Sequence, residues 1–258
     1  MLEEIEQQIE ELLDQTTHRP DPLPQLPWIM YQCWQNLLFI SWPVPIERLR
    51  PLVPTRMELD TYNGQAWLTQ VPMQMVKLHL RDLPPLAGAS TFPEINLRTY
   101  VRVKNQLGVF FFSIDSATHL GAWTARHLFH LPYLYAQMKL YRRGDSFYVQ
   151  SHRPASEETP AADFVANYRP VGQLAATKPG SLEHFLFERY LLFCQSPMGI
   201  LFRGDSHHPP WALQPVEVKI KTNTVPQAAG FELPTTALQY HYSPGTQSLM
   251  WPIVPISL

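Results

Sequence analysis

The stretch from Glu94 to Val103 constrains the fold most strongly, because polar and apolar residues alternate along it with a period of two. One face is apolar apart from a threonine and consists of Ile95, Leu97, Thr99, Val101 and Val103. The other face is polar and consists of Glu94, Asn96, Arg98, Tyr100 and Arg102. This period predicts a β-strand with one buried face. The polar face is then either the solvent side of a sheet, the usual case for an antiparallel strand, or a binding surface inside a barrel.

The composition predicts a globular protein built mainly from strands. The chain has 258 residues, 45% of them hydrophobic, which is enough for one large domain with a sizeable core. It contains 26 prolines and only 11 glycines, which favours short strands and rigid connections over long helices. The net charge is -2 and no basic stripe is present, so we expect no nucleic-acid partner.

The sequence also indicates where the protein resides. The two cysteines, Cys33 and Cys194, cannot form a disulfide framework, and buried thiols in a reducing compartment are the simplest interpretation. The acidic N-terminus lacks the positive and apolar regions of a signal peptide. No apolar run is long enough to span a bilayer, so we expect no membrane partner and, by elimination, a cytoplasmic location.

The chain divides into three segments. Residues 1–17 are expected to form an amphipathic helix with an apolar stripe of Leu2, Ile5, Ile9, Leu12 and Leu13. Residues 18–27 carry four prolines and predict an extended linker, and residues 28–258 predict a single domain. The helix would dock on this domain, on a partner or on a second copy in a homo-oligomer. We expect it to be dispensable for folding.

Alternation and turn signals predict a mostly antiparallel sheet with strands near residues 37–42, 57–61, 66–76, 95–103, 108–115, 134–141, 147–152, 200–203, 216–222 and 238–242. The pair Asn63-Gly64 predicts a hairpin between the second and third of these strands. Short helices are expected at residues 43–52, 118–130 and 181–188. A closed or partly closed barrel would bury so many strands without leaving exposed edges.

Several sequence blocks resemble the YqjF-like family, a family with a domain of unknown function. The blocks lie at residues 42–54, 58–67, 92–101, 112–115, 179–190 and 208–211. They span almost the whole chain after the linker, so the resemblance is specific, but it implies no established activity.

The order of the blocks is also similar, more distantly, to acetoacetate decarboxylase. In that family a strand leads into a short helix that matches Arg48-Leu-Arg-Pro-Leu-Val-Pro54, and then into a strand that matches Met57-Glu-Leu-Asp60. The resemblance implies an antiparallel β-barrel around a buried polar cavity for residues 28–258. A cavity glutamate begins the matching strand in the decarboxylase, and Glu94 falls at that place.

The resemblance does not extend to the catalytic amine of the decarboxylase. That enzyme forms a Schiff base on the first of two adjacent lysines that follow a proline. Here the proline is Pro132, and Tyr133 and Leu134 occupy the two lysine places. Lys139 lies six residues further along, about 20 Å away on a strand. We therefore expect no Schiff-base chemistry.

We also expect neither a cofactor nor a metal site. The pairs His127 and His130, and His207 and His208, invite a metal interpretation, but neither pair has a clear third ligand nearby.

The predicted site follows from the polar strand face and from the place of the missing lysine. The candidate catalytic residues are Glu94 and Tyr133, and the candidate ligand-binding residues are Arg98, Asn96, Tyr100 and Tyr135. A buried glutamate has a raised pKa and can act as an acid or a base. An arginine binds a carboxylate in bidentate fashion. Packing in the core is an equally good interpretation of Tyr133.

Two functions are consistent with these patterns. In the first, the barrel binds a small organic acid or a ketone-like ligand, and the sequence leaves open whether the protein is an enzyme. In the second, the chain is a non-catalytic interaction or regulatory module that uses its N-terminal helix, and aromatic side chains fill the barrel. The state of the barrel interior discriminates between them.

Overall fold

Strands make up most of the chain, as the alternating patterns predict. The computed structural model describes residues 2–83, 90–119, 126, 128–157, 159–233 and 239–257. The strands are β1 (Met30–Val44), β2 (Glu58–Leu59), β3 (Ala66–Leu80), β4 (Phe92–Val103), β5 (Gln106–Ser116), β6 (Tyr133–Tyr135), β7 (Gln137–Arg143), β8 (Ser146–Arg153), β9 (Ala162–Pro170), β10 (Ala175–Ala176), β11 (Leu191–Gln195), β12 (Leu201–His207), β13 (Ala212–Leu213), β14 (Val216–Asn223), β15 (Gln239–Met250) and β16 (Val254–Pro255). The helices are α1 (Leu2–Asp14), α2 (Ile46–Leu49), η1 (Arg50–Leu52), α4 (Leu182–Phe187) and α5 (Val225–Ala228).

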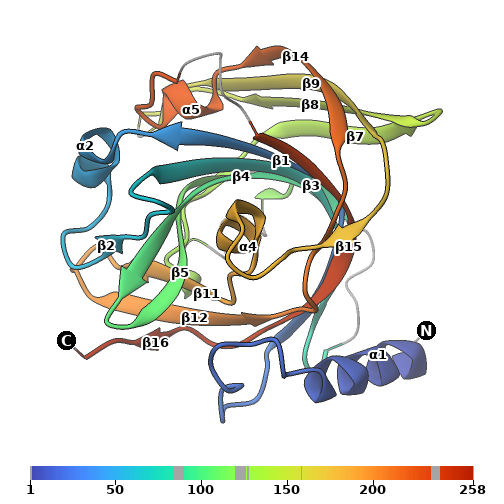
Figure 1. The fold of residues 1–258 in the computed structure, drawn as a ribbon, viewed down its shortest axis with the longest axis vertical. Helices are drawn as coiled ribbons and strands as arrows, with labels where there is room; N and C mark the ends of the chain where they lie inside the picture. Colours follow the sequence, from blue (N-terminus) through green and yellow to red (C-terminus); the bar gives the residue numbers. More distant parts are fainter. Residues whose placement is uncertain are drawn as a thin grey trace.

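The largest sheet closes on itself. Its strand order is β2-β4-β3-β1-β15-β12-β11-β5-β6, and β4 pairs in addition with β5, so the path returns to its start as a barrel (Figure 1). Gly108 in β5 allows this closure, because a Cβ atom there would lie 2.7 Å from the carbonyl oxygen of Leu191 in β11. Most pairings are antiparallel, whereas β5 runs parallel to β11 and β6. The predicted mainly β, antiparallel fold is confirmed.

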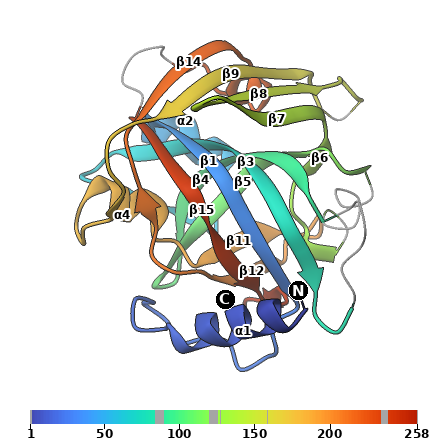
Figure 2. The ribbon, with the colours of Figure 1, turned by 90° about the vertical axis from the view of Figure 1, so that its right-hand side faces the viewer.

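A second sheet, in the order β14-β9-β8-β7, covers one side of the barrel (Figure 2). Alternate residues of β8 and β9, such as Val149 and Phe164, are fully buried against barrel residues such as Ile40 and Leu97. The strand predictions missed β9 and β11 and did not separate this second layer from the barrel. The alternation of Ala162, Phe164, Ala166 and Tyr168 was the available signal for β9.

Helix α4 lies at one mouth of the barrel: it appears within the ring of strands in Figure 1 and at the edge of the molecule in Figure 2. It begins as predicted at Ser181, whose hydroxyl oxygen accepts a hydrogen bond of 3.1 Å from the backbone N–H of His184. Its residues Leu186 and Phe187 are buried with Phe39 and Val71 of the barrel wall. The helix therefore covers part of one mouth of the barrel, with Leu186 and Phe187 packed against the wall.

Helix α1 packs against the outer side of its own barrel, beside β1 and β15 (Figure 2). Ile5, Ile9 and Leu12 are buried with Tyr31 and Trp251. In the Pro-rich segment, Arg19 donates a hydrogen bond of 2.6 Å to the backbone oxygen of Ser206 and lies 3.7 Å from the Asp205 carboxylate. The N-terminal helix predicted over residues 1–17 is thus present as α1, and the Pro-rich segment after it is anchored to the barrel at Arg19.

Two local predictions were wrong. Asn63 and Gly64 form the predicted turn, with φ angles of 51° and 78°, but β2 pairs with β4 instead of β3. The strand predicted over residues 134–141 is two strands, because the chain leaves the barrel at Ala136, between β6 and β7. Most of the helix predicted over residues 118–130, and the first residue of the strand predicted at 238–242, lie outside the described residues.

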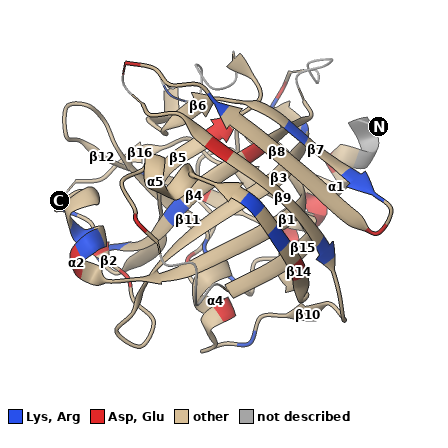
Figure 3. Cartoon of the chain, turned by 90° about the horizontal axis from the view of Figure 1, so that it is seen from above, with Lys and Arg blue, Asp and Glu red and all other residues tan. Residues whose placement is uncertain are grey.

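Charged residues are sparse and of mixed sign over the elements of the fold (Figure 3). Long uncharged stretches separate the lysines and arginines from one another (Figure 3). Within the part of the chain that the structure describes, none of the helices has the length and hydropathy needed to span a membrane.

Candidate functional site

The polar face of β4 points into the barrel. Glu94 lies opposite Met73 of β3, and Asn96 lies opposite Val71. Residues that face each other across paired strands share a face of the sheet. Because Val71 and Met73 belong to the buried cluster around α4, Glu94 and Asn96 also face the interior. The solvated outer face is therefore excluded for these two residues, which are only 3% and 6% exposed.

Glu94 and Tyr133 meet inside the barrel. The Tyr133 hydroxyl donates a hydrogen bond of 3.2 Å to Oε2 of Glu94. The pKa of Glu94 is raised to about 7: burial raises it most, hydrogen bonds from Tyr133 and Asn96 lower it, and the nearby Asp115 charge adds a smaller increase. Burial also raises the pKa of Tyr133 well above its ordinary value. Near neutral pH, the pair therefore holds a carboxyl group poised between its two protonation states and a neutral phenol.

Strand β6 carries Tyr133 and Tyr135 beside β5. Tyr133 pairs with Ile114 and Tyr135 with Ser116, which itself lies opposite Glu94. Tyr135 is half-buried and stacks on His119, with ring centroids 3.4 Å apart. Lys139 is exposed on β7 in the second sheet. Lys139 therefore cannot replace the missing lysine beside Tyr133 in the barrel interior.

Arg98 lies on the same strand as Glu94, but the two side chains do not contact each other through a hydrogen bond or ion pair. It is half-buried, opposite Thr69 of β3 and Phe111 of β5. Its Nε and Nη2 atoms are buried, and neither has a hydrogen-bond partner among the described residues. The structure brings Arg98 close enough to Arg189 for the two charges to repel. No ion pair or hydrogen bond joins Arg98 to Glu94 within the described part of the chain.

Asn96 and Tyr100, the other candidates on this face, differ in their surroundings. Oδ1 of Asn96 is a buried acceptor without a partner among the described residues. The Tyr100 hydroxyl is 2.7 Å from Thr69 Oγ1, which is 2.9 Å from Ser41 Oγ. Tyr100 is therefore held in a chain of hydroxyl groups, whereas Asn96 keeps an acceptor free for a ligand.

Two charged residues that the site prediction did not include line the same end of the barrel. Arg189, directly after α4, donates a hydrogen bond of 2.8 Å from Nη1 to the Asp60 carboxylate. Its guanidinium group lies over the rings of Phe185 and Tyr100. The resemblance block at residues 179–190 was the available signal for Arg189. Asp60 also pairs with Arg102 at 3.1 Å, and no ion pair is present for Arg98 among the described residues.

The unpartnered polar atoms inside the barrel are mostly hydrogen-bond donors. Besides the two nitrogens of Arg98, the indole Nε1 atoms of Trp34 and Trp67 are buried without a partner among the described residues. Trp34 stacks on the buried Trp211 at 5.9 Å, so this side of the interior is packed with aromatic rings. Arg98, Phe111 and Tyr133 keep part of their surface exposed. The interior therefore favours a ligand that is rich in acceptors, at the side of β4 and β6.

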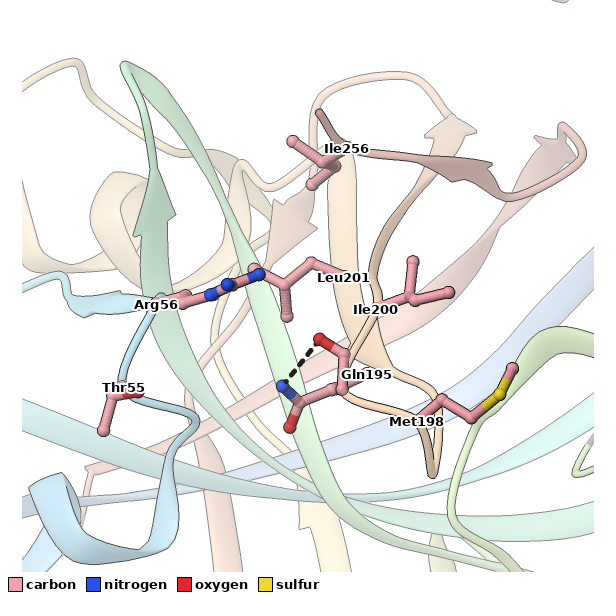
Figure 4. Close-up of a pocket in the computed structure, with 8 residues that line it drawn as sticks. Thr55, Arg56, Gln195, Met198, Ile200, Leu201 and Ile256 are labelled. Carbon is pink, nitrogen blue, oxygen red and sulfur yellow. Dashed lines mark hydrogen bonds between the residues drawn. The ribbon is translucent and has the colours of Figure 1, made fainter. Parts of the chain in front are cut away.

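Two depressions at the surface do not include the predicted residues. One, of about 430 Å³, is lined by Thr55, Arg56, Gln195, Met198, Gly199, Ile200, Leu201 and Ile256. In Figure 4, Arg56 reaches from the loop before β2 toward Leu201. The other, of about 400 Å³, is lined by Trp42, Ile220, Lys221, Thr222, Asn223, Pro226, Gln227, Phe231, Leu233 and Tyr240. None of these side chains carries a buried, unpartnered polar atom among the described residues, so the barrel interior is the better candidate site.

The same fold occurs in solved structures of acetoacetate decarboxylase. The enzyme from Legionella pneumophila subsp. pneumophila aligns with a TM-score of 0.59 and 15% identity, over 94% of this chain and 93% of that chain. The enduracididine biosynthesis enzyme MppR complexed with pyruvate aligns with a TM-score of 0.60 and 10% identity, over 90% of this chain and 92% of that chain. At these identities the likeness shows the fold alone. The protein is thus a mainly β protein with an acetoacetate-decarboxylase-like fold.

The chain belongs to the DUF2071 family, described as an uncharacterised conserved protein, whose pattern matches residues 31–247. It is 44% identical over 226 residues to the uncharacterised protein YqjF of Bacillus subtilis (strain 168), which covers 88% of this chain and 92% of YqjF. The resemblance to the YqjF-like family is confirmed. The family match begins after α1 and the Pro-rich segment.

Proposed function

We propose that this protein binds a small organic acid or a ketone-like ligand in its barrel, without Schiff-base chemistry. The observation that carries the proposal is the Arg98 guanidinium group, whose Nε and Nη2 atoms are buried without a partner among the described residues. A buried charge without a partner is costly, and a ligand carboxylate would satisfy both nitrogens through a bidentate contact. A neighbour of the same fold, MppR, has been solved complexed with pyruvate, a small organic acid.

Each candidate residue has a role in this proposal. Arg98 binds the carboxylate, and the free acceptor of Asn96 orients a donor group of the ligand. Glu94 supplies a titratable carboxyl group, and Tyr133 holds that carboxyl in place. Tyr100 and Tyr135 form parts of the wall. Any catalysis would be proton transfer at Glu94, because a carboxyl group with a pKa near 7 accepts and releases a proton at neutral pH.

A thermal-shift screen of small carboxylic acids tests the binding. A ligand at 100 times its Kd stabilises a protein by about 2.7 kcal/mol, which raises the melting temperature by roughly 5–10 °C for a chain of this size. The substitution Arg98→Leu should abolish this gain, and Glu94→Gln should keep most of it. Lys139→Gln, which removes an exposed cation from the second sheet, should behave as wild type. The proposal fails if no acid shifts the wild type.

The absence of Schiff-base chemistry has a test of its own. Borohydride reduces an imine to a stable amine, so treatment of the protein with a 2-oxo acid and borohydride should leave its mass unchanged. Intact-protein mass spectrometry provides the measurement. An adduct mapped to a lysine would contradict the interpretation of Tyr133 and Leu134.

The alternative function, an interaction module that uses the N-terminal helix, has less support. The described part of the helix stripe, Ile5, Ile9 and Leu12, is already buried on the protein's own barrel. A partner would have to displace this packing before it could bind the stripe.

A further inference from the structure

We propose that the protein has a second ligand site, on the outside of the barrel, which binds a small aromatic carboxylate. The outer site is the depression of about 400 Å³ whose lining includes Trp42 of β1, Lys221 of β14, Phe231 after α5 and Tyr240 of β15. In Figure 1, β14 and α5 lie above β1, on the side of the second sheet. The inference does not depend on the function proposed for the barrel interior.

The outer site faces away from that interior. Trp42 and Phe231 belong to the buried cluster between the barrel and the second sheet. Across the pairing of β1 with β3, Trp42 lies opposite Leu68 of the same cluster, whereas Trp67, the residue before Leu68, belongs to the cluster of the interior. Successive residues of a strand point to opposite faces of the sheet. A ligand at the outer site would therefore not contact the polar face of β4.

Aromatic rings form much of the wall of the outer site. Trp42 and Phe231 are only 4% and 3% exposed, which places them at its base, and Tyr240 is half-buried. Phe231 is held in place by Phe112, with the ring centroids 4.8 Å apart. A volume of about 400 Å³ is within the usual range for sites that bind small molecules, and such sites are mainly apolar and aromatic. The wall therefore favours a flat aromatic ring, which packs well against other rings.

Lys221 supplies a positive charge at the edge of the outer site. It is exposed, and it is the only charged residue among the described residues that line the depression. Glu232 follows Phe231 in the chain, but it is exposed and does not belong to the lining. A carboxylate on the ligand would therefore meet a cation at this edge and no opposing anion of the lining.

The backbone of β14 is irregular at Lys221. Ile220 pairs with Ala166 of β9, and Thr222 pairs with Val165, the residue before it, so Lys221 is an extra residue with no partner opposite. Such a bulge changes the direction of a side chain and is frequent beside functional sites. The bulge thus gives Lys221 a different setting from Lys219, which lies in the regular part of the same strand.

A buried amide group adds a hydrogen-bond donor behind the wall. Asn223 lines the outer site, and its Oδ1 accepts a hydrogen bond of 3.3 Å from the backbone N–H of Val225, so its Nδ2 faces Gln70. Nδ2 donates a hydrogen bond of 2.9 Å to Oε1 of Gln70. This leaves Nε2 of the fully buried Gln70 without a partner among the described residues. An ammonium group and a free amide donor both favour a ligand with oxygen acceptors over a cationic ligand.

Calorimetric titration with 2-naphthoate and its neutral analogue 2-naphthamide tests the inference. 2-Naphthoate should bind the wild type with a Kd of about 1 mM or tighter, the value expected for a ligand of this size. 2-Naphthamide should bind about three- to fivefold more weakly, because an ion pair with an exposed cation contributes only this much. Lys221→Gln should bring the two ligands to the same affinity. Lys219→Gln is the matched control and should keep the difference, because Lys219 is exposed on the same strand but does not line the site.

Two further variants separate the outer site from the interior. Tyr240→Leu removes a ring from the wall and should weaken both ligands about threefold or more. Arg98→Leu, in the barrel, should change neither affinity. If Arg98→Leu abolishes the binding of 2-naphthoate and Lys221→Gln does not affect it, the acid binds in the interior, so this inference is wrong and the proposed function gains support. No binding of 2-naphthoate at millimolar concentrations, or an equal loss in Lys219→Gln, would also overturn the inference and leave the proposed function to its own test.

Discussion

Glu94 couples the candidate site to the stability of the fold. It is 3% exposed, and burial raises its pKa from an ordinary value of 4.5 to about 7. The folded protein therefore holds a proton that the unfolded chain releases between these two pH values. A raised carboxyl pKa means that folding loses stability as the pH rises through this window, because the unfolded state ionises more easily. Above about pH 8 the loss is complete and constant.

The substitution Glu94→Gln should remove this pH dependence. The amide keeps the shape of the side chain and an oxygen for the Tyr133 hydroxyl, but it does not titrate. Relative to wild type, the variant should gain about 3 kcal/mol between pH 4.5 and pH 8, at about 1.4 kcal/mol for each unit of pKa shift. Urea unfolding of both proteins at pH 4.5, 6 and 8 provides the measurement. Parallel pH curves for the two proteins would show that Glu94 is not a buried titrating group.

The sequence predicts the positions of some residues of the candidate site and not of others. The alternation from Glu94 to Val103 predicts the strand, and the resemblance predicts that its polar face turns inward, which holds for Glu94 and Asn96. The sequence did not indicate that Arg98 lies with Arg189 rather than with Glu94. That outcome depends on an ion pair between Asp60 and Arg189, which are 129 residues apart in the chain. Local patterns carry no information on such a contact.

A buried ion pair joins β5 of the barrel to β8 of the second sheet. Arg153 of β8 donates a hydrogen bond of 2.6 Å from Nη1 to the Asp115 carboxylate of β5, and the two side chains are 3% and 0% exposed. Ser113 and Ser151 lie on the same strands with buried hydroxyl groups. The pair thus links the barrel to the second sheet by a charged contact.

Removing one member of this pair should be costly. Asp115→Asn leaves the Arg153 charge buried and uncompensated, and breaking such pairs costs about 3–5 kcal/mol. Asp163→Asn is the matched control, because Asp163 pairs with His152 at a side chain that is 47% exposed, where about 1 kcal/mol or less is expected. Urea unfolding at pH 8 compares the two variants with wild type. Equal losses would mean that the buried pair contributes no more than an exposed one.

The elements themselves were predicted better than their pairing. Strands β4 and β5 form the expected antiparallel pair, because a short turn joins two alternating segments. The segment at residues 134–141 was predicted as one strand, since period-two alternation continues through Ala136. The structure uses that residue to move from the barrel to the second sheet. Alternation records which side of a strand is buried, but not which sheet buries it.

At the scale of the whole molecule, the N-terminal segment covers part of the outer side of the barrel. The ring nitrogen Nε2 of His207 lies 2.6 Å from the carbonyl oxygen of Leu12, and Nδ1 lies 3.5 Å from Nη1 of Arg19. Burial lowers the pKa of His207 to about 4, so the ring is neutral at physiological pH and can donate to Leu12 while it accepts from Arg19. The segment outside the family match is therefore integrated into the fold through both apolar and polar contacts.

The sequence-based expectation that the helix is dispensable stays untested, and this packing leads us to the opposite prediction. Deleting residues 1–17 would expose Tyr31, Leu249 and Trp251, and it would remove the partner of His207. We expect a clear fall in the urea midpoint, and Leu12→Ala alone should cost about 2–5 kcal/mol, the usual range for a buried leucine. Glu10→Ala, on the exposed side of the same helix, should change stability by about 0.5 kcal/mol or less. If the truncated chain unfolds at the same midpoint as the full chain, the helix contributes no net stability. The apolar stripe would then be available to a partner, and the interaction-module function would regain support.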